Sequence, residues 1–269
     1  MKESEITWTY LEKLKETGPL VHNITNYVVM NNTANALLSI GASPVMAHST
    51  EEVADMAAIA SALVINIGTL SKHWVEAMEI AMKSASENNV PIIVDPVGAG
   101  ATAYRTDTVK HLMSVNSPDI IRGNASEIGA LYSADVKTKG VDSTQDSQSA
   151  IEAAQYLAKG YNCVVVVSGE TDYIITETQT RSSHNGHPLM GRVTGMGCTA
   201  SALIGAFSGT GIGAEEASLA AMRVMGIAGE MAAEKADGPG SFQVHFLDAL
   251  YQLDRKVIEH RLKPEKAHA

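Results

Sequence analysis

Short apolar segments alternate with helical segments along this chain, and this alternation constrains the fold more than any other feature. Four predicted helices, each followed by a predicted strand, lie at 51–61 and 62–68, 71–87 and 91–96, 103–114 and 119–124, and 147–159 and 163–169. Strands separated by helices of about three turns are typical of a parallel sheet with helices on both faces. The pattern therefore predicts an α/β fold with a mostly parallel central sheet.

The rest of the chain extends this plan. The segment YIITETQT, residues 173–180, closely follows the strand at 163–169 and is expected to form a hairpin that adds antiparallel strands at one edge. From Thr199 to Val257 the pattern is helical, with a Gly/Pro break at 236–241. Because no long linker, low-complexity tract or fixed-period repeat divides the sequence, we predict a single domain over residues 1–269.

Composition narrows the class of partner. The formal net charge is −10 and 45% of the 269 residues are hydrophobic, which disfavours nucleic acid and anionic membranes and favours a small-molecule ligand. The N-terminus has no apolar signal segment and no run is long enough to span a membrane, so we expect a cytoplasmic protein. Two cysteines, Cys163 and Cys198, are too few for a disulfide scaffold and are expected to be free thiols.

Polar residues follow several of the predicted strands. Asp95, Arg122 and Ser168 each end an apolar strand, and the loop 194–197 precedes the last helical half of the chain. Ligands of parallel α/β sheets bind beyond the carboxyl ends of the strands. We therefore expect these positions to converge on one site.

Asp95 and Glu127 are candidate ligands for a magnesium ion, because carboxylates shared with phosphates and water suit this hard cation. Glu127 has a second interpretation, since Asn124 and Glu127 have the spacing of a helix capping box. Arg122 suits a phosphate group through its planar donor fork, or alternatively a structural ion pair. Ser168 precedes Gly169 and could equally belong to a turn.

The residues Gly195, Met196, Gly197 and Cys198 form a glycine loop at the predicted start of a helix. Unpaired N–H groups at such a start favour phosphate or a developing anion. The same position would lower the pKa of the Cys198 thiol, although a buried hydrophobic role is the alternative. The spacing G-x-G-x-x-A occurs twice, here and after Gly98, and no G-x-x-x-x-G-K-[ST] loop is present, which disfavours a nicotinamide enzyme and a Walker-type ATPase.

The segment 21–49 is rich in asparagine between apolar residues, and most of these asparagines, Asn23 included, are expected in caps and turns. Met46 offers a polarizable sulfur that would suit a sulfur heterocycle, with a core methionine as the alternative.

Five motifs in this order, VHNITNYVVMNNTANALLSIGASPVMA, PIIVDPVGAGAT, IIRGNASEI, VVVSGETDYI and RVTGMGCTASALIGAF, resemble the hydroxyethylthiazole kinase family over nearly the whole chain. The resemblance implies a ribokinase-like three-layer α/β/α sandwich that assembles as a homotrimer with active sites between subunits. It also implies transfer of phosphate from ATP, with Mg²⁺, to the hydroxyl of 4-methyl-5-(2-hydroxyethyl)thiazole in thiamine biosynthesis.

Carried over by position, the resemblance implies substrate contacts from Met46, Gly195 and Asn23. It implies ATP contacts from Arg122 and Ser168, a magnesium site at Asp95 and Glu127, and an anion hole formed by Gly195, Met196, Gly197 and Cys198. Cys198 is the implied catalytic residue, although many ribokinase-like relatives have an aspartate base there. A kinase for another heterocyclic alcohol, such as a pyrimidine methanol, and a nucleotide-binding regulator without turnover are the alternatives.

Overall fold

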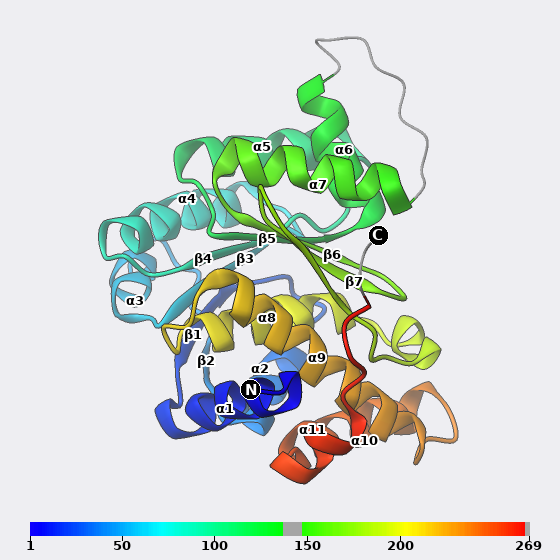
Figure 1. The fold of residues 1–269 in the computed structure, drawn as a ribbon. Helices are drawn as coiled ribbons and strands as arrows, with labels where there is room; N and C mark the ends of the chain where they lie inside the picture. The colour runs from blue at the N-terminus through cyan, green and yellow to red at the C-terminus, as the bar shows by residue number, and fades with distance from the viewer. Residues whose placement is uncertain (137–146, 267–269) are drawn as a thin grey trace.

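The computed structural model describes residues 1–136 and 147–266, which form a twisted sheet between two layers of helices (Figure 1). The sheet has the strand order β2-β1-β3-β4-β5-β6-β7-β8. Its strands are β1 (Leu20–Ile24), β2 (Ser43–Val45), β3 (Ala62–Asn66), β4 (Ile92–Asp95), β5 (Ile120–Asn124), β6 (Val164–Ser168), β7 (Asp172–Ile175) and β8 (Thr180–Ser183). All pairings from β2 to β6 are parallel, whereas β7 and β8 are antiparallel.

The helices divide between the two faces of the sheet (Figure 1). One layer contains α1 (Glu3–Thr17), α2 (Met30–Ile40), α8 (Met196–Ser208), α9 (Ala214–Ala233), α10 (Pro239–Gln252) and α11 (Arg255–Arg261). The other contains α3 (Val53–Ile59), α4 (Lys72–Glu87), α5 (Ala103–Val115), α6 (Ala125–Val136) and α7 (Ser147–Tyr161). This arrangement confirms the three-layer α/β/α sandwich.

Two apolar cores follow from the alternation of side chains along the strands. In β3, Val64 packs into the core beneath α8 and α9, whereas Leu63 and Ile65 pack into the core beneath α3, α4 and α5. Because successive side chains of a strand point to opposite faces, a strand buried on both faces is apolar on both. This explains why the central strands are nearly continuous apolar runs, with polar residues such as Asn66, Asp95 and Arg122 only towards their carboxyl ends.

The predicted elements are largely confirmed. The helix expected at 71–87 is α4, and Ser71 caps it by accepting a hydrogen bond from the backbone of Trp74. The antiparallel hairpin is β7 and β8. The C-terminal half contains more breaks than expected, because residues 209–213 and 253–254 also separate helices, and α10 begins at Pro239, inside the expected break. Helix α8 begins at Met196, earlier than the helical pattern indicated.

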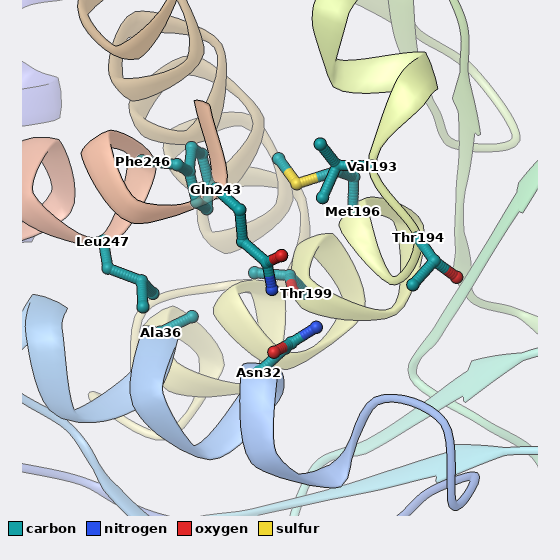
Figure 2. Close-up of a pocket in the computed structure, with 9 residues that line it drawn as sticks. All are labelled: Asn32, Ala36, Val193, Thr194, Met196, Thr199, Gln243, Phe246 and Leu247. Atoms are coloured by element: carbon teal, nitrogen blue, oxygen red, sulfur yellow. The ribbon is translucent and has the colours of Figure 1, made fainter. Parts of the chain in front are cut away.

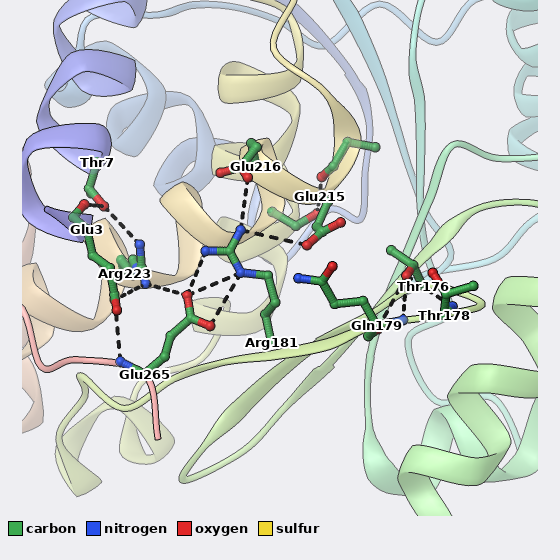
Figure 3. A network of polar contacts seen from close by, with 12 residues as sticks. Glu3, Thr7, Thr176, Thr178, Gln179, Arg181, Glu215, Glu216, Arg223 and Glu265 are labelled. Carbon is green, nitrogen blue, oxygen red and sulfur yellow. Dashed lines mark hydrogen bonds and ion pairs between the residues drawn. The ribbon is translucent and has the colours of Figure 1, made fainter. Parts of the chain in front are cut away.

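Charged side chains join the two ends of the chain across α9 (Figure 3). Glu265 accepts hydrogen bonds from Arg181 of β8 at 2.7 Å and from Arg223 of α9 at 2.7 Å. Arg223 is buried and also pairs with Glu3 of α1. Removing one partner from a buried charge is costly, so this network fixes the C-terminal segment against the body of the protein.

Within the described part of the chain, none of the helices has both the length and the apolar character that crossing a membrane requires.

Candidate active site

The carboxyl ends of four neighbouring strands bring the candidate residues together. Asn66 ends β3, Asp95 ends β4, Arg122 lies in β5 and Ser168 ends β6. The parallel register places Asn66 directly beside Asp95, and Arg122 beside Val166 of β6. The expected convergence of Asp95, Arg122 and Ser168 at one edge of the sheet is therefore observed.

Asp95 is the most buried of these groups, with an exposed fraction of 0%. Its Oδ2 atom accepts hydrogen bonds from Ser201 Oγ at 2.7 Å and from Asn66 Nδ2 at 2.9 Å, and lies 3.7 Å from Arg122 Nη1. Burial raises the pKa of Asp95 to about 6, against the lowering effect of Arg122 and of the hydrogen bonds. The carboxylate is thus held in place by several groups although its charge is poorly solvated.

Arg122 reaches across the strand ends and is itself nearly buried. Its Nη2 donates a hydrogen bond to Ser168 Oγ at 2.5 Å. A Cβ atom at Gly197 would lie 2.6 Å from Arg122 Nη1, so the guanidinium occupies the space that the missing side chain leaves at the start of α8. The arrangement places a permanent cation beside the helix N-terminus, which suits a polyphosphate.

Glu127 acts as a helix cap. Its backbone N–H donates to Asn124 Oδ1, and its Oε2 accepts from the Asn124 backbone, which is the reciprocal capping box, here with Asn in place of Ser or Thr. Its Oε1 accepts from the backbone of Gly98 at 2.8 Å. Its charge also raises the pKa of Asp95, although less than burial does. The capping interpretation is therefore confirmed, and Glu127 belongs to the electrostatic environment of Asp95 as well.

The glycine loop leads into α8 as expected. Gly195 has a positive φ of +84°, and a side chain there would also meet Val29 at 2.8 Å. Met196 and Gly197 begin the helix, and Cys198 occupies its first turn. Asn26 Nδ2 lies 3.5 Å from Cys198 Sγ, at hydrogen-bond distance for sulfur.

The expected lowering of the Cys198 pKa is wrong. Burial raises the pKa of the thiol, and the nearby charge of Asp95 raises it further, outweighing the hydrogen bonds from Asn66 and Asn26 that lower it. A helix N-terminus favours a thiolate, but desolvation and a neighbouring carboxylate oppose it. Near neutral pH the thiol is therefore protonated in this structure.

Met46 and Asn23 come from the end of β2 and from β1, on the other side of β3 from Asp95. Met46 follows β2, the edge strand, and its backbone oxygen accepts a hydrogen bond from His48 Nδ1. Asn23 is not in a cap or turn as expected but is buried in β1, where its Nδ2 donates to the Val21 oxygen and its Oδ1 has no hydrogen-bond partner among the described residues. Among the described residues, no hydrogen bond joins either of them to Asp95, Arg122 or Cys198.

A small pocket lies behind the glycine loop (Figure 2). It is lined by α2, α10 and residues of the 193–199 segment, including Thr194 and Met196. Its lining includes Met196 of the glycine loop but neither Asp95 nor Arg122.

Sequence reasoning missed three residues of the site. Asn66 ends β3 in the same way that Asp95 ends the next strand, and Ser201 follows Cys198 by one helical turn, so both had positional signals. The guanidinium of Arg105 donates to the backbone oxygens of Ile67, Gly68 and Val97 at 2.8 to 3.0 Å. It thereby joins the loops that follow β3 and β4, and no local sequence pattern indicates this role.

Known proteins resemble the chain over almost its whole length. A model of the hydroxyethylthiazole kinase family matches residues 11–256. A hydroxyethylthiazole kinase from Syntrophus aciditrophicus is 57% identical over 260 residues, which are 96% of each chain. One from Leptospira biflexa is 54% identical over 252 residues, 94% of each chain.

Solved structures agree with these matches. The hydroxyethylthiazole kinase protein from Pyrococcus horikoshii OT3 has a TM-score of 0.90 at 42% identity, covering 98% of this chain and 100% of the other. A ribokinase-like superfamily protein from Enterococcus faecalis has a TM-score of 0.66 at 12% identity, covering 93% and 94% of the two chains, and shows the ribokinase-like fold alone. The chain with the Asp95, Arg122 and Cys198 cluster therefore belongs to the hydroxyethylthiazole kinase family.

Proposed function

We propose that this protein transfers the γ-phosphoryl group of ATP to the hydroxyl of 4-methyl-5-(2-hydroxyethyl)thiazole, in thiamine biosynthesis or salvage in the cytoplasm. One observation carries the proposal: Arg122 lies beside Asp95 and against Gly197 at the start of α8. Arg122 also donates a hydrogen bond to Ser168. A cation, a hydroxyl and free helix N–H groups at one point form a place for the phosphates of ATP.

In this reaction the substrate hydroxyl oxygen forms a bond to the γ-phosphorus, and the bond from that phosphorus to the bridging oxygen of ADP breaks. Arg122 and the N–H groups of residues 195–198 neutralise charge on the transferred group, with Ser168 orienting Arg122. Only the thiolate form of Cys198 can accept the hydroxyl proton, which gives the thiol. Because the raised pKa leaves little thiolate near neutral pH, this proton transfer is not indispensable, and position and charge supply most of the acceleration.

Two carboxylates fit a magnesium ion shared with the phosphates. Asp95 Oδ1 is buried without a hydrogen-bond partner among residues 1–136 and 147–266, and each Glu127 oxygen accepts one backbone N–H and keeps a lone pair. Among the described residues, no group of three or more His, Cys, Asp or Glu side chains forms a metal site, so phosphate and water would complete the shell. The ion would supply positive charge to the β- and γ-phosphates. Asp95 and Glu127 would hold it, through water where needed.

The protein would assemble as a homotrimer with sites between subunits, in which Met46, after the edge strand β2, serves the site of a neighbouring copy. Residues 1–269 would form one domain in each subunit. Met46 would then face a thiazole bound mainly by the Gly195 loop of a neighbouring copy, whereas Asn23 is fully buried in β1 and would support that site without facing the neighbour. Tyr27 and Leu38, near α2, are more than half exposed and supply apolar surface for such an assembly.

Release of ADP tests the proposed function. Purified protein with ATP and Mg²⁺ is offered the thiazole alcohol, a pyrimidine methanol and buffer alone. We expect ADP formation to require the thiazole. A preference for the pyrimidine methanol would replace the substrate, and ATP binding without ADP release under any condition would instead indicate a nucleotide-binding regulator.

Complementation tests the shared site. A Met46→Glu chain and an Asp95→Asn chain, each weakly active alone, are expressed together and purified as mixed assemblies. If Met46 serves the neighbouring subunit, some sites combine an intact Met46 with an intact Asp95, and activity returns. If both residues serve the same subunit, no site regains both and activity stays low. Light scattering should give about three times the chain mass.

A further inference from the structure

We propose that Ser201 and Asn66 are positioning residues that hold Oδ2 of Asp95, so that Oδ1 is kept free for the cation that accompanies the reacting phosphates. The inference rests on the proposed function for the identity of that ligand, but its structural basis is independent. The two oxygens of Asp95 differ sharply: Oδ2 accepts from Ser201 and Asn66 and faces Arg122, whereas Oδ1, equally buried, has no hydrogen-bond partner in the described part of the chain.

Ser201 holds Asp95 from the helical layer. It is fully buried on α8, one turn after Cys198, and donates from Oγ at 2.7 Å. The helix can approach this closely because Gly205, one turn further, has no side chain: a Cβ atom there would lie 2.7 Å from Val64 Cγ2. The same helix face thus carries Cys198, Ser201 and the contact with the sheet, so Ser201 ties Asp95 to the helix that forms the anion hole.

Asn66 holds Asp95 from the sheet. The register places the two residues side by side, and Asn66 Nδ2 donates to Asp95 Oδ2. Asn66 Oδ1 accepts from Asn26 Nδ2 at 2.9 Å and from the Gly68 backbone at 3.0 Å. Because its amide oxygen faces two donors and its nitrogen faces a carboxylate, the orientation of the amide is fixed.

Asn26 extends the network to the thiol, since its Nδ2 also lies 3.5 Å from Cys198 Sγ. Asp95, Asn66, Asn26 and Cys198 therefore form one connected polar network. A change at Asn66 would reach both the carboxylate and the proton acceptor.

A purely structural carboxylate would be arranged differently. Buried polar atoms are normally hydrogen-bonded, and leaving one unpaired destabilises the fold. Here three groups gather on one oxygen of Asp95 while the other is left without any, although both oxygens belong to a fully buried side chain. The arrangement gives up stability at Oδ1, as a site that reserves an oxygen for a ligand does.

The test compares Ser201→Ala with Ser208→Ala. Ser208 lies on the same helix and is buried, and no described residue hydrogen-bonds its hydroxyl, so its replacement makes the same chemical change without touching Asp95. We expect Ser201→Ala to lower kcat and weaken MgADP binding, measured by calorimetry, by about tenfold each, since hydrogen bonds to charged groups contribute this much. Ser208→Ala should stay within about twofold of the parent. Ser201→Cys keeps a weak donor of similar size and should fall between them.

A double-mutant cycle decides whether Ser201 acts through Asp95. In an Asp95→Asn background, Ser201→Ala should weaken MgADP binding no further, because both changes remove the same carboxylate function. An equal loss in both backgrounds would overturn the proposal, as would a Ser201→Ala chain that binds and reacts like Ser208→Ala. Asn66→Ala should repeat the Ser201→Ala result. Calorimetry remains informative if the parent fails to phosphorylate the thiazole, so failure of the proposed function is distinguished from failure of this inference.

Discussion

Gly197 and Arg122 are in such close contact that any side chain at position 197 would displace the guanidinium, because a Cβ atom would lie 2.6 Å from Nη1. Alanine is otherwise favoured over glycine inside a helix. Gly197→Ala should therefore leave the fold intact but raise the KM for ATP by about tenfold, as expected when a charge-assisted contact is displaced. Steady-state kinetics measure it. Gly191→Ala, where a Cβ would meet nothing within 4 Å, is the control. An unchanged KM would show that Arg122 does not serve ATP.

Substitutions at Cys198 test whether this residue accepts the proton of the substrate hydroxyl. Since burial and Asp95 raise the pKa of its thiol, Cys198→Ala should lower kcat by about tenfold, less than the ~10² of an effective general base, with little change in ATP affinity. Cys198→Asp should remain active. The control is Cys163→Ala, at a buried thiol near the start of β6. Parental turnover in Cys198→Ala, or a folded but inert Cys198→Asp, would exclude the role.

A substitution at Glu127 distinguishes its role as a helix cap from its proposed role in the magnesium site. Its two oxygens accept from the backbones of Gly98 and Asn124, and a glutamine has one acceptor oxygen, so Glu127→Gln should lose about 1 kcal/mol of stability. It should also raise the Mg²⁺ concentration for half-maximal rate and lower kcat. The exposed pair of Glu234 with Arg261 provides Glu234→Gln as a control. Unchanged magnesium dependence would leave Glu127 as a cap alone.

The titration of Asp172 should make the free energy of unfolding depend on pH. Burial raises its pKa to about 7, while its Oδ1 accepts from the Gly169 backbone. The raised value means that the folded state holds a proton which the unfolded chain releases near pH 4, so stability falls as the pH rises towards 7. Asp172→Asn keeps the acceptor and does not titrate. Its stability relative to the parent should increase by about 2 kcal/mol between about pH 5 and about pH 8, measured by denaturant unfolding. The same difference at both pH values would contradict this.

Much of the fold was predictable because the strands β3 to β6 are continuous apolar runs and the helices between them have clear periodicity and caps. Short β2, with three residues at the edge, has no such signal. The positions of Asp95, Arg122 and Ser168 followed from the rule that strand ends converge. Asn66 and Ser201 had positional signals in the sequence, but their hydrogen bonds to Asp95 depend on register and on how closely α8 approaches the sheet, which only the structure shows.

The prediction that the pKa of Cys198 is lowered was wrong for a similar reason. The helix start is visible in the sequence, but the burial of the thiol and its proximity to Asp95 are tertiary facts. The sequence showed that a helix N-terminus lowers the pKa of a thiol, but it did not show that burial and the charge of Asp95 raise it.

The most direct test of the central claim follows the phosphate itself. ATP labelled with ³²P at the γ-phosphorus is incubated with Mg²⁺, the thiazole alcohol and the purified protein, and the products are separated by chromatography. We expect the label to move to the thiazole phosphate in step with ADP formation, and we expect this transfer to be lost in Arg122→Ala. Label appearing only as inorganic phosphate, or transfer that persists unchanged in Arg122→Ala, would contradict it.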